Sequence, residues 1–420
     1  MSEQAIHRTI DTLWRMESAR IIATVARMVR DVGLAEELAQ DALVTALEKW
    51  PGSGIPDKPA AWLMTTAKHK AIDYLRRNTL LQNKHEELGY ELEVQQMGES
   101  DTARLDDDIG DDLLRLVFAA CHPVLSSEAQ VALTLRLLGG LSTDEIARAF
   151  LVPEATIAQR IVRAKRSLSN AQIPFEVPRK QELKERLDGV LGVLYLIFNE
   201  GYSATAGADL MRPALCEEAL RLGRVIAELM PLESEVHGLV ALMEIQASRA
   251  NARVNASGEP ILLLEQNRAR WDRLLIRRGL VALERAEKLG GANKPYALQA
   301  AIAACHARAL AADQTDWLRI ASLYGVLAAV TPSPVIELNR AVAVGMAAGA
   351  EAGLKLADAL NAEPLLQNYH LLPAVRGDFL QKLERFEEAH AEFERAASLT
   401  RNDRDRELML KRAAGCRSSS

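Results

Sequence analysis

Apolar residues recur at helical spacing along nearly the whole chain, and no segment alternates apolar and polar residues as a strand would. Three amphipathic helices are predicted near the start, over residues 8–32, 35–50 and 60–77. Gly33 is placed to end the first helix in a left-handed conformation, and the prolines and glycines of residues 51–59 predict a loop after the second. The pattern indicates an all-α protein.

A helix-turn-helix is predicted over residues 141–168. Ser142 and Glu145 form an S-x-x-E capping box, in which the two side chains satisfy free amide hydrogens at a helix start, so a short helix should begin near Thr143. This helix cannot run far, because Pro153 lacks an amide hydrogen and suits the first turn of a new helix. A tight turn should therefore separate two helices.

The second helix of this motif has two unlike faces. An apolar stripe predicts which side is buried, and its members are Ile157, Ile161, Ala164 and Leu168. Residues 154–168 hold four basic side chains and one acidic one, in a chain whose formal net charge is -6. Arginine pairs with phosphates or guanine, and Thr and Gln can bond to bases, so the exposed side predicts a helix that binds the DNA major groove. The candidate DNA-binding residues are Thr156, Gln159, Arg160, Arg163 and Arg166. The alternative is an ordinary helical hairpin with a solvated basic face.

Charge is also segregated on two of the earlier helices. The helix over residues 35–50 has a carboxylate-rich outer face, to which Glu37, Gln40 and Asp41 contribute. The helix over residues 60–77 is basic, and the residues that make it so are Lys68, Lys70, Arg76 and Arg77.

An acidic stretch separates the two basic parts of the chain. Residues 86–112 hold eleven acidic side chains and a single arginine, Arg104. Such a segment repels itself and has little apolar surface to bury, so we expect an extended linker over residues 81–112. The predicted domains on either side span residues 8–80 and 113–172.

The remainder of the chain, residues 175–420, is helical in pattern and shows a weak internal repeat. Residues 380–399 resemble a tetratricopeptide repeat, with Glu384 in place of the usual glycine. Four apolar positions of this segment align with four positions 37 residues earlier, namely Leu383, Ala389, Phe393 and Ala396 with Met346, Ala352, Leu356 and Ala359. Helix pairs of this kind bury their faces only against neighbours, which predicts an α-solenoid.

Composition excludes several classes of protein. The chain has 420 residues, enough for several domains, and a hydrophobic fraction of 49% that supports buried cores. Its four cysteines lie far apart, which argues against a disulfide framework or a zinc site. With no signal peptide, membrane-spanning run, P-loop or dinucleotide-binding motif in the sequence, we expect a cytoplasmic protein that needs no metal or cofactor and has no catalytic activity of its own.

Four segments together resemble a known family. In order, AEELAQDALVTALEKW, AWLMTTAKHKAIDYLRR, the acidic linker and VPEATIAQRIVRAKRSL resemble regions 2 and 4 of bacterial extracytoplasmic-function sigma factors, group IV of the sigma-70 family. The rest of the chain, with LYLIFNEGY, QNRARWD and PSPVIELNRAVAV, looks like the long tetratricopeptide-like extension of one subgroup.

This resemblance implies a role for each set of candidate residues. Glu37, Gln40 and Asp41 would dock on the β′ clamp helices of core RNA polymerase, and Lys68, Lys70, Arg76 and Arg77 would contact the −10 element. The loop of residues 51–59 would capture a flipped base, and region 4 would bind the β flap. Thr156, Gln159, Arg160, Arg163 and Arg166 would bind the −35 element.

The implied function is that of an alternative sigma factor that directs promoter recognition, with its C-terminal helices acting in cis or binding an unidentified ligand or protein. The alternative is a helix-turn-helix regulator with a helical sensor domain. Both need the basic helix of residues 154–168, but only the sigma factor needs the helix of residues 35–50 to bind polymerase.

Overall fold

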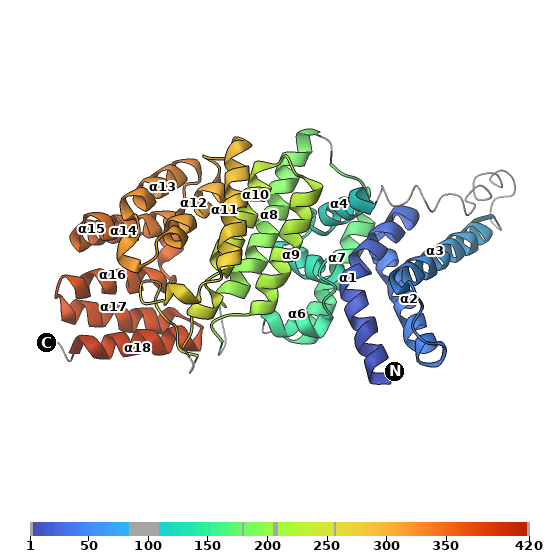
Figure 1. The fold of residues 1–420 in the computed structure, drawn as a ribbon, viewed down its shortest axis with the longest axis horizontal. Coiled ribbons are helices and arrows are strands. Elements are labelled where there is room, and N and C mark those ends of the chain that lie inside the picture. The colour runs from blue at the N-terminus through green and yellow to red at the C-terminus, as the bar shows by residue number, and fades with distance from the viewer. Residues whose placement is uncertain are drawn as a thin grey trace. The chain divides into compact units, whose positions relative to one another are not determined.

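The computed structural model describes residues 3–83, 109–150, 152–178, 180–204, 209–255 and 258–417. Their regular structure is helical apart from one isolated antiparallel bridge between Val254 and Pro260. The chain divides into two compact units, residues 1–194 and 195–420, which are coloured blue to green and green to red in Figure 1. Most of the predicted acidic linker, residues 84–108, lies outside the described residues.

The first unit begins with three helices that pack on one another: α1 (Glu3–Val29), α2 (Val32–Ser53) and α3 (Pro59–Asn83). Ile10 and Leu63 are fully buried among them. Trp50 and Trp62 make an edge-to-face contact with ring centroids 5.4 Å apart, which joins the end of α2 to the start of α3.

Two predicted helix ends were wrong. Arg30, not Gly33, takes the left-handed conformation after α1, with φ 56°, because Asp31 caps the next helix and accepts a hydrogen bond from the Leu34 amide at 2.8 Å. Gly33 therefore lies in the first turn of α2. At its other end α2 continues through Pro51 to Ser53, and Gly54, with φ 83°, ends it.

The first unit continues with four shorter helices, α4 (Ile109–Ala120), α5 (Ser127–Leu137), α6 (Thr143–Phe150) and α7 (Glu154–Asn170). Asp112, which we expected in the linker, instead lies in α4 with 1% of its surface exposed. Its carboxylate pairs with Arg27 of α1 at 3.2 Å and with Arg115 at 2.6 Å. The acidic composition led us to place Asp112 in the linker. It lies in α4 instead, because Arg27 and Arg115 neutralise its buried charge.

The second unit is built from helices that pack mainly against their neighbours in sequence. Helix α8 (Lys180–Tyr202) continues from the first unit into the second. The helices that follow are α9 (Pro213–Leu229), α10 (Ser234–Ala247), α11 (Arg273–Lys288), α12 (Pro295–Arg308), α13 (Trp317–Val330), α14 (Pro334–Ala348), α15 (Ala350–Ala359), α16 (Leu371–Lys382), α17 (Phe386–Leu399) and α18 (Asp403–Arg417). Within this unit Figure 1 shows α16, α17 and α18 stacked side by side.

The internal repeat is present with a spacing different from the predicted one. Gly353 and Ala357 of α15 are buried, whereas Ala359 is exposed. The two buried residues lie 36 residues before Ala389 and Phe393, which are fully buried in α17. The predicted alignment was therefore one residue out, because it matched alanines rather than the buried face.

Candidate nucleic-acid interface

The predicted helix-turn-helix is formed by α6 and α7. The Ser142 amide donates to Glu145 Oε2 at 2.8 Å, and the Glu145 amide donates to Ser142 Oγ at 3.1 Å, so the capping box is confirmed and α6 begins at Thr143. Burial raises the pKa of Glu145, but hydrogen bonds from Ser142 and the charge of Arg15 outweigh it and lower that pKa overall. Glu145 also forms an ion pair with Arg15 of α1.

Helix α7 presents its two faces as predicted. Pro153 precedes the helix as its N-cap residue rather than lying in its first turn. The apolar stripe is buried throughout, and its members are Ile157, Ile161, Ala164 and Leu168. On the opposite side Thr156, Gln159, Arg163 and Arg166 are exposed, and Arg160 is half-buried.

A groove runs along the basic face of α7. It has a volume of about 420 Å³ and is lined on one side by the start of α5, including Ser126 and Glu128. The α7 residues that line it are Thr156, Gln159, Arg160, Arg163, Ala164 and Ser167. Ser126 caps α5, and hydrogen bonds from the backbone and Ser126, together with the charge of Arg160, lower the pKa of Glu128. Arg166 lies outside this groove.

The arginines on the basic face of α7 are not neutralised by nearby carboxylates of the described residues. Within the described part of the chain, Arg160, Arg163 and Arg166 form no ion pair. By contrast, Arg148 of the preceding helix pairs with Asp144 at 2.7 Å. Exposed guanidinium groups that are not paired with a carboxylate are free to contact phosphates and base edges.

The acidic face of α2 is only partly free. Glu37 and Asp41 are exposed, but Gln40 is half-buried and donates from Nε2 to Glu36 Oε1 at 2.5 Å. The Glu36 side chain is 3% exposed and also accepts a hydrogen bond from Arg136 Nε of α5 at 2.7 Å. It forms an ion pair with Lys165 of α7, whose Nζ lies 2.5 Å from Oε2. Glu36, Arg136 and Lys165 were not among the predicted site residues. The sequence held one sign of this cluster: Glu36 lies on the apolar face of α2, between Val32 and Ala39, where a glutamate needs a buried partner.

The basic residues of α3 form a separate surface. Arg76 and Arg77 are exposed, whereas Lys68 and Lys70 are half-buried. Helix α3 packs on α1 and α2, while α7 packs on α5, α6 and α2, so the two basic faces belong to different helical groups joined through α2.

The described residues offer no group of three or more metal-ligating side chains, and none of the helices they form is long and apolar enough to cross a bilayer. The cysteines among them are unbridged. Burial raises the pKa of the Cys121 thiol to about 11, despite a hydrogen bond to Thr134, and raises that of Cys216 to about 12. Both thiols are therefore held in the protonated, unreactive form near neutral pH.

Family models match three segments of the chain. Residues 13–80 match sigma-70 region 2, residues 115–168 match sigma-70 region 4, and residues 186–287 match a family of unknown function, DUF6596. An uncharacterized protein of Rhizobium meliloti (strain 1021) is 43% identical over 401 residues, covering 93% of each chain.

Two relatives with assigned names match less than half of this chain. The probable ECF RNA polymerase sigma factor SigI of Mycobacterium tuberculosis is 24% identical over 179 residues, which is 42% of this chain and 59% of that protein. The ECF RNA polymerase sigma factor SigK of Mycobacterium ulcerans is 28% identical over 158 residues, covering 36% of this chain and 79% of that protein.

Proposed function

The chain belongs to the extracytoplasmic-function sigma factors that carry a C-terminal helical extension, and from this premise we propose which of its surfaces carry each step of promoter recognition. As an alternative sigma factor it binds core RNA polymerase and directs transcription from selected promoters. Sigma factors as a class supply recognition and leave the nucleotide chemistry to polymerase. We assign residues 8–80 to the −10 element and polymerase, residues 113–172 to the −35 element, and residues 175–420 to regulation in cis.

The observation that carries this proposal is the basic face of α7. Thr156, Gln159, Arg160 and Arg163 line one groove, and none of its arginines is neutralised within the described residues. In this assignment these side chains, with Arg166, contact the −35 element, where phosphate contacts set the position and base contacts set the sequence. The β flap of polymerase holds the same helical group.

The exposed Arg76 and Arg77, together with Lys68 and Lys70, contact the backbone of the −10 element. Glu37 and Asp41 form the accessible part of the face that docks on the β′ clamp helices. Gln40 contributes to docking only after it leaves Glu36, because its amide already donates to that carboxylate.

Binding both promoter elements requires the two helical groups to separate. The −10 and −35 elements lie about 80 Å apart along a duplex with a rise of about 3.4 Å per base pair. Helix α3, with 25 residues, spans only about 37 Å, and it packs on α2, to which Lys165 of α7 is ion-paired. The pairing of Glu36 therefore belongs to a compact form that precedes promoter binding.

Run-off transcription with core polymerase on genomic fragments tests the proposal and locates the promoter. Replacing Arg163 with Ala should weaken transcription from that promoter about tenfold, the loss expected for one base or phosphate contact. Arg148→Ala is the matched control, since Arg148 is an exposed arginine of the same motif that already pairs with Asp144. Equal effects of the two substitutions would contradict the assignment of α7.

Polymerase binding is tested separately by capture of core polymerase. The pair of substitutions Glu37→Ala and Asp41→Ala should reduce capture, whereas Glu48→Ala, at an exposed position of the same helix, should not. A DNA-binding regulator without a polymerase role would capture no polymerase in any of these forms. A shortened chain of residues 1–178 should differ from the full chain in promoter activity or selectivity if the extension acts in cis.

A further inference from the structure

The second unit encloses a cavity that promoter recognition does not use. Its volume is about 680 Å³, and its walls come from four segments far apart in the sequence. The lining residues fall within positions 202–204 and 210, 249–253 and 260–266, 368–371, and 399–409. The cavity thus lies where the start of this unit meets its end.

Two arginines line the cavity and stack on one tyrosine. The guanidinium carbon of Arg253 lies 3.8 Å from the centroid of the Tyr202 ring, and Arg253 donates to the Tyr202 carbonyl. Arg249 donates to the Tyr202 hydroxyl at 2.6 Å and lies 5.7 Å from the ring of Trp271. Arg268, 5% exposed, approaches that same Trp271 ring at 5.0 Å.

These three arginines have hydrogen-bond partners but form no ion pair within the described residues. No carboxylate of the described residues lies within ion-pair distance of Arg249, Arg253 or Arg268. Burial lowers the pKa of Arg253 and the charge of Arg249 adds to this lowering, while Tyr202 and Asp405 only partly oppose it. A guanidinium group kept charged among like charges favours an anion beside it.

The other titratable groups leave the cavity with excess positive charge. Asp405 is the one carboxylate among the described lining residues, and it is opposed by Arg249, Arg253 and the exposed Arg401. Burial lowers the pKa of the lining His370, which keeps its imidazole neutral near pH 7. The net charge of the lining residues is therefore positive.

A buried amide adds a second, independent indication of a ligand. Gln266 is 8% exposed and donates from Nε2 to the Ile261 carbonyl at 3.1 Å. Its Oε1 is buried and has no hydrogen-bond partner among the described residues, and Gln266 is one of the residues that line the cavity. A buried acceptor without a partner costs about 1–3 kcal/mol, which a donor on a ligand would recover. Apolar side chains complete the wall, namely Leu210, Leu262, Leu263, Leu371, Leu408 and Met409.

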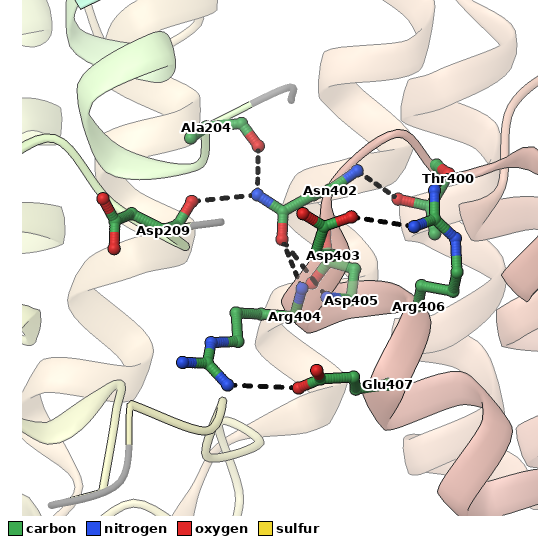
Figure 2. Close-up of polar contacts among 9 residues, drawn as sticks. All are labelled: Ala204, Asp209, Thr400, Asn402, Asp403, Arg404, Asp405, Arg406 and Glu407. Atoms are coloured by element: carbon green, nitrogen blue, oxygen red, sulfur yellow. Dashed lines mark hydrogen bonds and ion pairs between the residues drawn. The ribbon is translucent and has the colours of Figure 1, made fainter. Parts of the chain in front are cut away.

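The wall is held in place by Asn402, which is 1% exposed (Figure 2). Its Nδ2 donates to the Asp209 carbonyl at 2.9 Å and the Ala204 carbonyl at 3.1 Å. Its Oδ1 accepts from the Arg404 and Asp405 amides, so one side chain both caps α18 and ties it to the segment after α8. This arrangement preforms the cavity instead of leaving it to close around a ligand.

We propose that this cavity binds a small organic anion with an apolar body, its acidic headgroup on Arg249 and Arg253 and an N–H or O–H donor on Gln266 Oε1. The apolar body lies against the leucines. Inorganic phosphate lacks that body, and a neutral lipid lacks the headgroup, so neither satisfies both parts of the wall.

Calorimetric titration of the full chain with N-octanoylglycine tests the proposal, because this molecule combines a carboxylate, an amide N–H and an alkyl chain. One molecule should bind at least about tenfold more tightly than its neutral methyl ester, since charge-assisted hydrogen bonds to arginine are lost in the ester. Inorganic phosphate should bind at least about tenfold more weakly than N-octanoylglycine, because it buries no apolar surface.

Three variants locate the binding. Arg253→Gln should abolish the preference for the acid over the ester. Arg401→Glu changes an exposed residue at the rim, keeps the fold intact and should weaken binding of the acid severalfold by charge reversal. Arg319→Glu, a reversal at an exposed position of α13 outside the cavity, should leave binding unchanged.

Acid and ester binding with equal affinity, no saturable binding of the acid at millimolar concentration, or equal effects of Arg401→Glu and Arg319→Glu would each overturn the proposal. The titration needs neither polymerase nor DNA, so its failure would leave the assignment of the promoter-binding surfaces intact.

Discussion

Lys165 of α7 forms an ion pair with the buried carboxylate of Glu36 of α2, with Nζ 2.5 Å from Oε2. The same helix α7 carries the candidate −35 residues, and α2 carries the candidate polymerase-binding face. One ion pair therefore joins the two surfaces that, in the function we propose, separate when promoter DNA is bound. A buried ion pair adds little net stability, but removing one of its two partners is costly, because the other charge stays buried without compensation. Such a pair therefore favours either the fully closed contact or the fully separated one.

Glu36→Gln should lower the free energy of unfolding of the first unit by about 3 kcal/mol, near the lower limit for a broken buried pair, because Arg136 and Lys165 can each reach solvent. Urea denaturation measures the change. Asp144→Asn is the control, since the pair of Asp144 with Arg148 is exposed on both sides and should contribute less than about 1 kcal/mol. A loss of similar size in the two variants would remove Glu36 from this role.

The helix-turn-helix could be predicted from the sequence because everything that defines it is local. Ser142 and Glu145 lie three residues apart, and the apolar stripe of α7 repeats within one helix. The exposed faces of α2 and α7 followed from the same periodicity. Local patterns of this kind are satisfied by the helix itself and by the side on which it packs.

Glu36 could not be interpreted in the same way, because Arg136 lies 100 residues away in the sequence. Asp112 was misassigned for the same reason, since its partner Arg27 belongs to another helix. The cavity of the second unit was equally hidden. Its lining residues come from four distant segments, and no motif in any one of them signals a site.

The buried His306 should make the second unit sensitive to acid. Burial, followed by the charges of Arg249 and Arg268, lowers the pKa of His306 to about 3. Because the folded-state pKa lies below that of an unfolded histidine, about 6.5, stability is complete above pH 6.5 and falls as pH decreases toward 3. At pH 5 the loss should be about 2 kcal/mol relative to pH 7.

His306→Phe keeps an aromatic ring beside Trp317, whose centroid lies 5.2 Å from that of His306, and removes the proton-binding site. The difference in free energy of unfolding between pH 7 and pH 5 should therefore shrink by about 2 kcal/mol in this variant. Carboxylates that titrate in the same range contribute equally to both proteins and cancel. His69→Phe, at an exposed position of α3, should leave the difference as it is in the unmodified chain.

Glu384 occupies a position that favours glycine. It has φ 60° after α16, where its amide donates to the Gln381 carbonyl at 3.1 Å and the Arg385 amide donates to the Leu380 carbonyl at 2.9 Å. These are the two bonds of a Schellman motif, whose left-handed residue is usually glycine. Glu384→Gly should stabilise the second unit by about 0.5–1 kcal/mol, because relief of backbone strain exceeds the added entropy of the unfolded chain.

The same change inside a helix has the opposite sign. Glu387→Gly, in the first turn of α17, should destabilise the unit by up to about 1 kcal/mol. Thermal denaturation of both variants should therefore move the transition in opposite directions. A lower transition temperature for Glu384→Gly would show that the glutamate side chain contributes contacts worth more than the strain.

Asn402 should be the most sensitive polar residue of the second unit. Asn402→Asp keeps an oxygen to cap α18 but loses both Nδ2 donors, which leaves the carbonyls of Ala204 and Asp209 facing a carboxylate. The expected loss is about 3 kcal/mol, from two unpaired carbonyls and one buried charge. Asn361→Asp, the same change at an exposed position, should cost less than about 0.5 kcal/mol.

Hydrogen exchange distinguishes a local effect of Asn402→Asp from general unfolding. If Asn402 ties α18 to the segment after α8, the amides of α18 should lose protection first, while those of α10 and α12 remain protected. Binding of N-octanoylglycine should weaken in parallel, because residues 399–409 form one wall of the cavity. Unchanged protection of α18 together with unchanged binding would mean that the two carbonyls find other donors, and the cavity would then owe its shape to helix packing alone.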